Sequence, residues 1–149
     1  MTYELRVERV LDALPEFVFD VFLDSSAQEE LFAGPPDSEA VLLESDMDLR
    51  VGGTWLMVFG QSGQELFRLT YAFTELVRPH RISATFSLDQ AGNVEYSIVD
   101  VTFQERDGKT LLTLVQRGFE TEQQRDMYLG GAPYFLERLE RAVAVRAGQ

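Results

Sequence analysis

The sequence contains no cysteine, one histidine (His80) and one lysine (Lys109) among its 149 residues. The absence of cysteine excludes disulfides, thiol nucleophiles and thiolate metal sites. A single imidazole excludes a metal site built from several histidines. His80 falls in a polar turn, where a general base would lack hydrogen-bonding reach to a substrate in a pocket. We therefore predict no catalytic residue, no metal site and no cofactor from these residues.

Positive charge is also scarce, because 13 basic residues stand against 25 acidic ones and the formal net charge is −12. Nucleic-acid binding depends on Lys and Arg that neutralise phosphates, so this balance argues against a nucleic-acid partner. The acidity is local: residues 1–75 hold 15 acidic and 4 basic side chains (net −11), and residues 76–149 hold 10 and 9 (net −1). An acidic N-terminal half is either a solubilising surface or a docking surface for a basic partner.

Long apolar runs are missing as well. No segment approaches the roughly 20 apolar residues of a membrane-spanning helix, and the N-terminus lacks the apolar core of a signal peptide. With 45% hydrophobic and 26% charged residues, the chain has the profile of a soluble globular protein. We expect one domain over residues 1–149, no membrane span and a cytoplasmic location.

Apolar periodicity predicts a strand-rich chain that ends in a long helix. Alternation or short apolar runs predict strands over residues 3–11, 40–44, 54–60, 65–76, 82–88, 94–104 and 110–119. Two short helices follow the first strand, one beginning near Pro15 and one over residues 27–32 that ends at Gly34-Pro35-Pro36. A long helix should begin after the N-cap Thr121 and run to about Val145, with a kink or a break at Gly130-Gly131 and Pro133.

Consecutive strands joined by short turns predict an antiparallel meander of six or seven strands in an α+β fold. The C-terminal helix is the one element long enough to cover the apolar face of such a sheet. A curved sheet that grips a single helix encloses space between them, and this is where we expect a cavity.

Four segments resemble a known superfamily. They are Arg9 with 13–19, Asp48-Leu49-Arg50-Val51-Gly52-Gly53-Thr54-Trp55, Glu75-Leu76-Val77-Arg78-Pro79-His80-Arg81-Ile82, and 130–139. They are similar to motifs of the START-like SRPBCC superfamily, and within it to the group named for the activator of Hsp90 ATPase. The resemblance covers nearly the whole chain and implies the helix-grip fold. The motifs are structural markers, so they are specific for the fold and weak for activity.

Aromatic residues with polar tips and flexible methionines are the candidates for lining the cavity. The candidate ligand-binding residues are Trp55, Met57, Phe67, Tyr71, Phe86, Tyr96, Met127, Tyr128, Tyr134 and Phe135. They favour a small hydrophobic or aromatic ligand. An inward-facing Arg68 or Arg117 would suggest a ligand anion, whereas an outward-facing one would be ordinary surface.

Two other functions stay open at this point. The superfamily includes cyclase- and hydrolase-type enzymes, which here would depend on tyrosine or carboxylate chemistry in the same cavity. The resemblance to the chaperone activator suggests a partner-binding module, whose acidic half would dock a chaperone or another protein. Homodimerisation is also open. Gly131 or Ala132 stands where the family has a tryptophan, which predicts either a larger cavity or a shifted helix with the space refilled by Tyr134 or Phe135.

Overall fold

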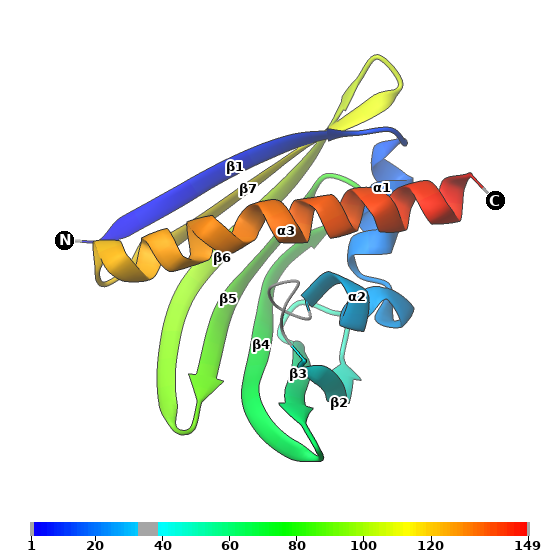
Figure 1. Ribbon diagram of the computed structural model, residues 1–149. Helices are drawn as coiled ribbons and strands as arrows, with labels where there is room; N and C mark the ends of the chain where they lie inside the picture. Colours follow the sequence, from blue (N-terminus) through cyan, green and yellow to red (C-terminus); the bar gives the residue numbers. More distant parts are fainter. Residues whose placement is uncertain (1, 33–38, 149) are drawn as a thin grey trace.

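Seven antiparallel strands form a curved sheet against which a long C-terminal helix lies (Figure 1). The computed structural model describes residues 2–32 and 39–148. The elements in order are β1 (Tyr3–Leu11), α1 (Pro15–Phe22), the 3-10 turn η1 (Ser25–Ala27), α2 (Gln28–Phe32), β2 (Val41–Met47), β3 (Thr54–Gln61), β4 (Gln64–Val77), β5 (Arg81–Gln90), β6 (Asn93–Arg106), β7 (Lys109–Phe119) and α3 (Glu122–Ala147). The predicted helix-grip fold is confirmed. The predicted break at Gly34-Pro35-Pro36 lies outside the described residues.

The strand order is β1-β7-β6-β5-β4-β3-β2. Strands β2 to β7 therefore form a meander, and β1 is the edge strand beside β7. Tight turns set the register of the hairpins. Between β6 and β7, Asp107 and Gly108 both have positive φ (54° and 80°), and Arg106 pairs with Lys109. Positive φ at both central residues is typical of the two-residue turn whose twist matches that of the flanking strands. The hairpin predicted at this position from Asp-Gly is therefore present.

Irregularities in the strand pairing help to curve the sheet. The register shifts between Leu42 and Glu44, between Phe59 and Gly60, and between Phe73 and Glu75. Bulges of this kind bend a strand and increase its local twist. The resulting concave face carries the inward-facing residues of each strand and is the side covered by α3 (Figure 1).

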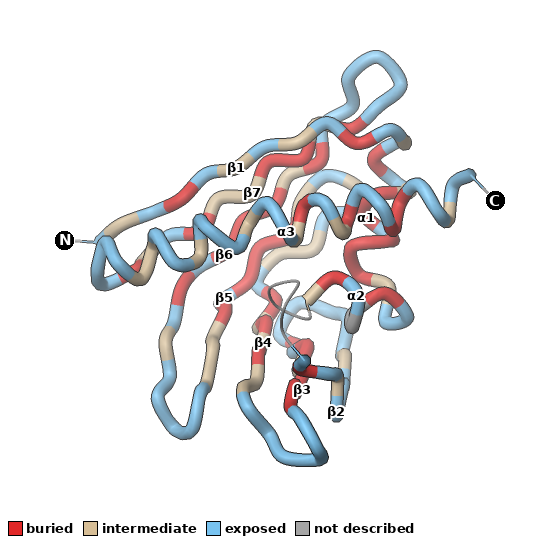
Figure 2. The backbone as a smooth tube through the Cα atoms, viewed as in Figure 1, coloured by how far each residue is buried: buried red, intermediate tan, exposed pale blue. Residues whose placement is uncertain are grey.

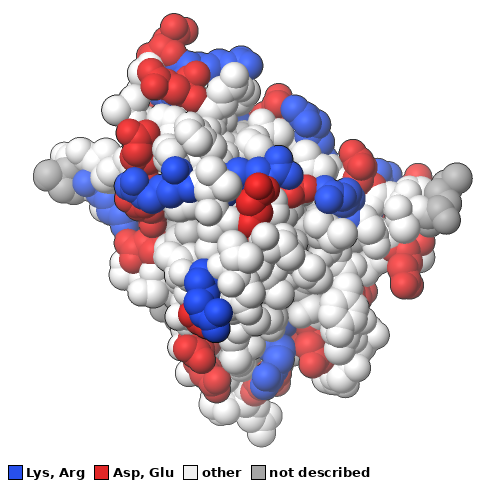
Figure 3. Space-filling view, turned by 180° about the vertical axis from the view of Figure 1, so that it is seen from behind, with Lys and Arg blue, Asp and Glu red and all other residues white. Residues whose placement is uncertain are grey.

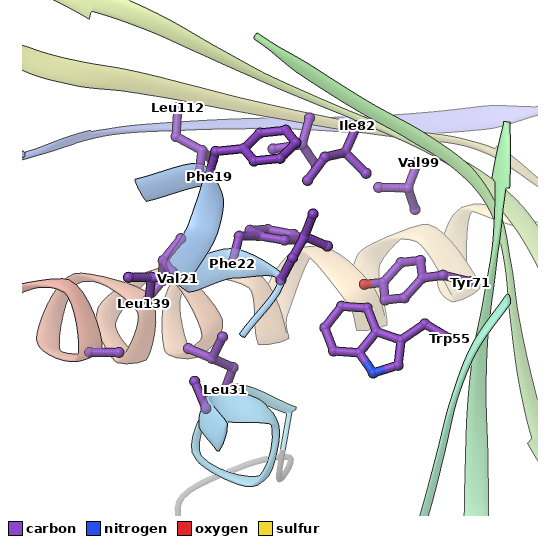
Figure 4. Packing of buried hydrophobic residues seen from close by; sticks show 14 of the residues in the cluster. Phe19, Val21, Phe22, Leu31, Trp55, Tyr71, Ile82, Val99, Leu112 and Leu139 are labelled. Carbon is purple, nitrogen blue, oxygen red and sulfur yellow. The ribbon is translucent and has the colours of Figure 1, made fainter. Parts of the chain in front are cut away.

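One end of the space between the sheet and α3 is densely packed. Two rings of α1 meet the β6 ring of Phe103 edge-on, Phe19 at 5.3 Å and Phe22 at 6.0 Å between ring centroids. Leu139 of α3 is fully buried in the same cluster (Figure 4). A void of about 10 Å³ remains beside Phe22 and Trp55, which is close to the space of one water. We call this region the closed end.

Helix α3 runs without a break from Glu122 to Ala147, so of the kink or break predicted at Gly130-Gly131 and Pro133, the break is wrong. Thr121 caps the helix as predicted, since its hydroxyl accepts the backbone N–H of Gln124 at 3.1 Å. Pro133 lies on the exposed side, where water can reach the backbone carbonyl that loses its donor. The buried residues of α3 are Leu136, Leu139, Ala142 and Val143, all in its C-terminal half (Figure 2).

The outer face of the sheet carries charged residues of both signs (Figure 3). Asp100 of β6 is the centre of one network and is 9% exposed. Its Oδ1 accepts the Ser83 hydroxyl at 2.6 Å and Arg81 Nη2 at 2.9 Å, and its Oδ2 accepts Arg117 Nη1. Arg81 also pairs with Glu75 at 2.7 Å. The network joins β4, β5, β6 and β7 across the back of the sheet. No helix within the described ranges is both long and apolar enough to cross a membrane.

Candidate ligand-binding cavity

A cavity of about 630 Å³ lies between the concave face of the sheet and the N-terminal half and middle of α3, from Met127 to Arg138. Its walls come from β1, β4, β5, β7, α2 and α3. Strand alternation supplies the sheet wall, since Tyr71 pairs with Phe86 and Leu69 pairs with Leu88 on the inward-facing side. Protein sites for small molecules typically measure about 300–1,000 Å³, so the volume suits such a ligand.

Seven of the ten residues predicted to line a cavity do border it: Phe67, Tyr71, Phe86, Met127, Tyr128, Tyr134 and Phe135. Trp55 and Met57 face the same side of the sheet but are 0% exposed and lie in the packed core. The ring of Phe32 covers Trp55 edge-on at 5.3 Å, which separates the indole from the cavity. Tyr96 lies on the outer face and is 64% exposed, so it does not border the cavity.

The outward position of Tyr96 follows from an inverted pattern in β6. Its neighbours Glu95 and Ser97 are the inward-facing residues, while Val94, Tyr96 and Ile98 are 40%, 64% and 40% exposed. Ser97 is buried and accepts a hydrogen bond from Gln116 Nε2 at 2.8 Å. Polar side chains therefore occupy inward-facing positions on this part of β6, where an ordinary core would carry apolar ones.

Small residues of α3 form the wall opposite the sheet. Gly130, Gly131 and Ala132 all border the cavity. A Cβ built on Gly130 or Gly131 would meet no atom within 4 Å, so no neighbouring group fills the space beside them. Of the two side chains expected to refill the space, Tyr134 is 44% exposed and leaves it open, whereas Phe135 packs against the rings of Phe22 and Phe32.

The sequence interpretation missed the contributions of β1, β7 and α2 to the wall. These are Leu5, Val7, Leu31, Phe32, Leu114 and Gln116, together with Arg138 of α3. A signal for β1 was present, since Leu5 and Val7 alternate in the predicted first strand. For α2 no signal existed, because a five-residue helix has too few turns to show which side packs inward.

The two arginines considered for a ligand anion both face away from the cavity. Arg68 makes two hydrogen bonds to the Glu65 carboxylate, at 2.9 and 2.7 Å. Arg117 pairs with Asp100 in the outer network. Both are thus ordinary surface residues, and Arg138 is the one cationic side chain among the described residues that border the cavity.

Two tyrosine hydroxyls belong to the cavity wall. Burial raises the pKa of Tyr71 well above its ordinary value, and the neighbouring Tyr128 raises it further. Burial also raises the pKa of Tyr128, and the charge and hydrogen bonding of Glu95 act in the same direction. Both hydroxyls therefore stay neutral and keep their protons throughout the physiological pH range.

Comparison with known proteins gives the family. The model for activator of Hsp90 ATPase homolog 1-like proteins matches residues 12–144. The chain belongs to this family. A crystal structure of a Chromobacterium violaceum protein is 31% identical, with a TM-score of 0.80 over 94% of this chain and 96% of that one. A Silicibacter pomeroyi structure named AHSA1 has the same fold at 21% identity, with a TM-score of 0.78 over 97% of this chain and 99% of that one. No curated protein matches the chain.

The segment 48–55 shows how a turn positions Trp55 in the packed core of this AHSA1-like protein. Gly52 has a φ of 89°, a left-handed conformation that favours glycine. A Cβ on Gly53 would collide with the backbone carbonyl oxygen of Asp48. The two glycines therefore allow a tight turn, closed by a hydrogen bond from the Asp48 N–H to the Thr54 carbonyl at 2.8 Å. The turn brings Trp55 to the first inward-facing position of β3.

Proposed function

We propose that this AHSA1-like protein binds a small, mostly apolar molecule in the cavity between the sheet and α3. The observation that carries the proposal is the cavity itself, about 630 Å³ in volume and bordered mainly by aliphatic and aromatic side chains. Burial of apolar ligand surface is favourable by roughly 25 cal/mol per Å², so such walls supply the driving force for binding. Family membership supports a helix-grip domain and leaves the ligand unspecified.

Exposed apolar residues at the cavity support this proposal. Met127 and Tyr134 of α3 both border it and are 59% and 44% exposed. Clustered apolar side chains on a protein surface mark binding sites more often than single ones do. The flexible methionine and the amphipathic tyrosine ring suit an opening through which a ligand enters.

The chain offers a direct test. N-phenyl-1-naphthylamine, a neutral dye that fluoresces in apolar sites, should bind saturably with a stoichiometry near one. Trp55 is the single tryptophan of the sequence and packs 5.5 Å from the ring of Tyr71, which borders the cavity. We expect dye binding to quench the Trp55 emission by energy transfer, with the same dissociation constant from both signals.

Comparing two leucine substitutions on α3 tests whether the dye binds in the cavity. Gly131→Leu places a side chain into the open space beside the helix and should weaken dye binding at least tenfold. Ala144→Leu adds the same side chain at an exposed position of the same helix and should leave binding unchanged. Absence of saturable binding, or equal binding to both variants, would contradict the proposal.

The enzyme and partner-binding interpretations of the sequence stay predictions. Partner binding through the acidic half would weaken as salt rises, because exposed charge pairs are screened. A dye affinity that is independent of salt would separate cavity binding from that electrostatic mode.

A further inference from the structure

The Tyr71 side chain is held rigidly at the cavity wall. Its ring lies 5.5 Å from the Trp55 ring, 5.1 Å from Phe86 and 6.1 Å from Phe32, measured between centroids. Aromatic contacts at these distances fix ring orientation on three sides. Figure 4 shows the hydroxyl oxygen directed away from β4, toward the space between the sheet and the helices.

No hydrogen bond joins the Tyr71 hydroxyl to another residue within the described part of the chain, and the residue is 9% exposed. Most buried hydroxyls are hydrogen-bonded, because an unmade bond leaves the cost of removing the group from water uncompensated. A rigidly packed ring that borders the cavity, with its hydroxyl directed toward the space between the sheet and the helices, meets the requirements of a ligand-recognition group. The pKa of Tyr71 is raised by burial, so the hydroxyl is a proton donor at every physiological pH.

The surroundings favour a neutral ligand group at this point. The electrostatic neighbour of the Tyr71 hydroxyl is Tyr128, whose own hydroxyl lies beside the Glu95 carboxylate. Glu95 Oε1 is buried and unpaired among the described atoms. An anionic ligand group beside the Tyr128 hydroxyl would lie near this carboxylate, and the repulsion between the two negative charges would cost free energy. Tyr128 is a weaker candidate donor, since its proton is favourably directed to Glu95.

We propose that the ligand is a neutral, mostly apolar molecule with one carbonyl or hydroxyl oxygen, and that this oxygen accepts a hydrogen bond from Tyr71. The inference rests on the proposed function, because it specifies the chemistry of the molecule in the same cavity. Tyr71 acts as a binding residue that selects for the acceptor. The apolar walls bind the remainder of the molecule.

Three naphthalene derivatives of equal shape test this chemistry by displacement of N-phenyl-1-naphthylamine. 2-Acetylnaphthalene carries a carbonyl acceptor, 2-isopropenylnaphthalene replaces the oxygen by a methylene, and 2-naphthoate carries a negative charge. Tyr71→Phe should weaken binding of the ketone by about three- to tenfold, the usual effect of losing one neutral hydrogen bond. The affinity for the alkene should stay unchanged. Tyr96→Phe removes a hydroxyl from an exposed residue on the outer face of the sheet, away from the cavity, and should change neither affinity. The wild-type protein should bind 2-naphthoate more weakly than the ketone.

Each remaining outcome counts against a specific claim. Displacement of the dye by neither neutral compound would overturn the proposed function. Displacement by both, with equal effects of Tyr71→Phe on ketone and alkene, would overturn the role of Tyr71 and leave cavity binding intact. Binding of 2-naphthoate as tight as that of the ketone would overturn the neutral ligand class. The midpoint of urea unfolding without ligand should not fall in Tyr71→Phe, and a fall would show a structural role for the hydroxyl instead.

Discussion

The two ends of the space between the sheet and α3 differ in what fills them. At the closed end, aromatic rings of α1 and the buried C-terminal half of α3 leave a void of about 10 Å³. At the open end, under the N-terminal half of α3, about 630 Å³ stays unfilled. The same helix thus completes the core at one end and provides the wall of a cavity at the other. Stability and binding should therefore depend on different residues of one continuous helix.

The largest expected effect separates the two halves of α3. Leu139→Ala removes a fully buried side chain at the closed end, and cavity-forming substitutions of this type cost about 2–5 kcal/mol. Met127→Ala changes a residue that is 59% exposed at the open end, so its effect should stay within about 0.5 kcal/mol. Urea unfolding followed by circular dichroism measures both. Similar losses of unfolding free energy in the two variants would show that both halves of α3 contribute equally to stability.

An intermediate effect on stability is expected from the hydrogen-bond and ion-pair network around Asp100 on the outer face of the sheet. Burial acts to raise the pKa of Asp100, but hydrogen bonds from Ser83 and Arg117 outweigh it, so the net pKa lies below the ordinary 3.8. A carboxyl with a lowered pKa in the folded state stabilises the fold at pH values above its ordinary pKa. That contribution disappears as pH falls through the lowered value.

Asp100→Asn should accordingly destabilise the protein at pH 7 by about 1–3 kcal/mol, the usual scale for hydrogen bonds to a charged group. The difference from the wild type should shrink on acidification from about pH 5 to pH 2. Unfolding midpoints across this range measure the effect. A constant difference would show that ionisation of Asp100 does not stabilise the fold, while dye affinity at pH 7 serves as the control for an intact open end.

The smallest expected effect comes from the glycines. Gly131→Ala adds a methyl group in open space within a helix, where glycine is less favourable than alanine by about 0.5–1 kcal/mol, so the variant should be more stable. Gly53→Ala would bring a Cβ against the Asp48 carbonyl and should be less stable. Thermal melts compare the two. A loss of stability at Gly131 would mean that the open end is packed more tightly than the structure shows.

Regular alternation made most of the fold predictable from the sequence. The inward-facing side of β5 follows from Ile82, Ala84 and Phe86, which alternate with Ser83 and Thr85 and border the small void or the cavity. The N-cap of α3 was predictable because a threonine hydroxyl reaches the backbone N–H three residues later. These features are local, and local sequence determines them.

The site was harder to predict because its residues depend on packing over long sequence distances. Trp55 and Met57 are on the expected side of their strand but lie in the core, and Trp55 is covered there by Phe32 of α2. For Tyr96 the periodicity was misleading, since the aromatic residue faces outward and polar Glu95 faces inward. The continuity of α3 through Pro133 depends on solvent access to one carbonyl, which composition cannot reveal.

The three small residues at positions 130–132 have a consequence for how this protein can diversify. Side chains at Gly130 and Gly131 would project into empty space, so larger residues there need displace no part of the core. For the ligand binding that we propose, mutations at these positions should therefore alter the size and shape of the accepted molecule while folding is preserved. This short stretch of α3 is then where we expect single substitutions to produce new ligand preferences.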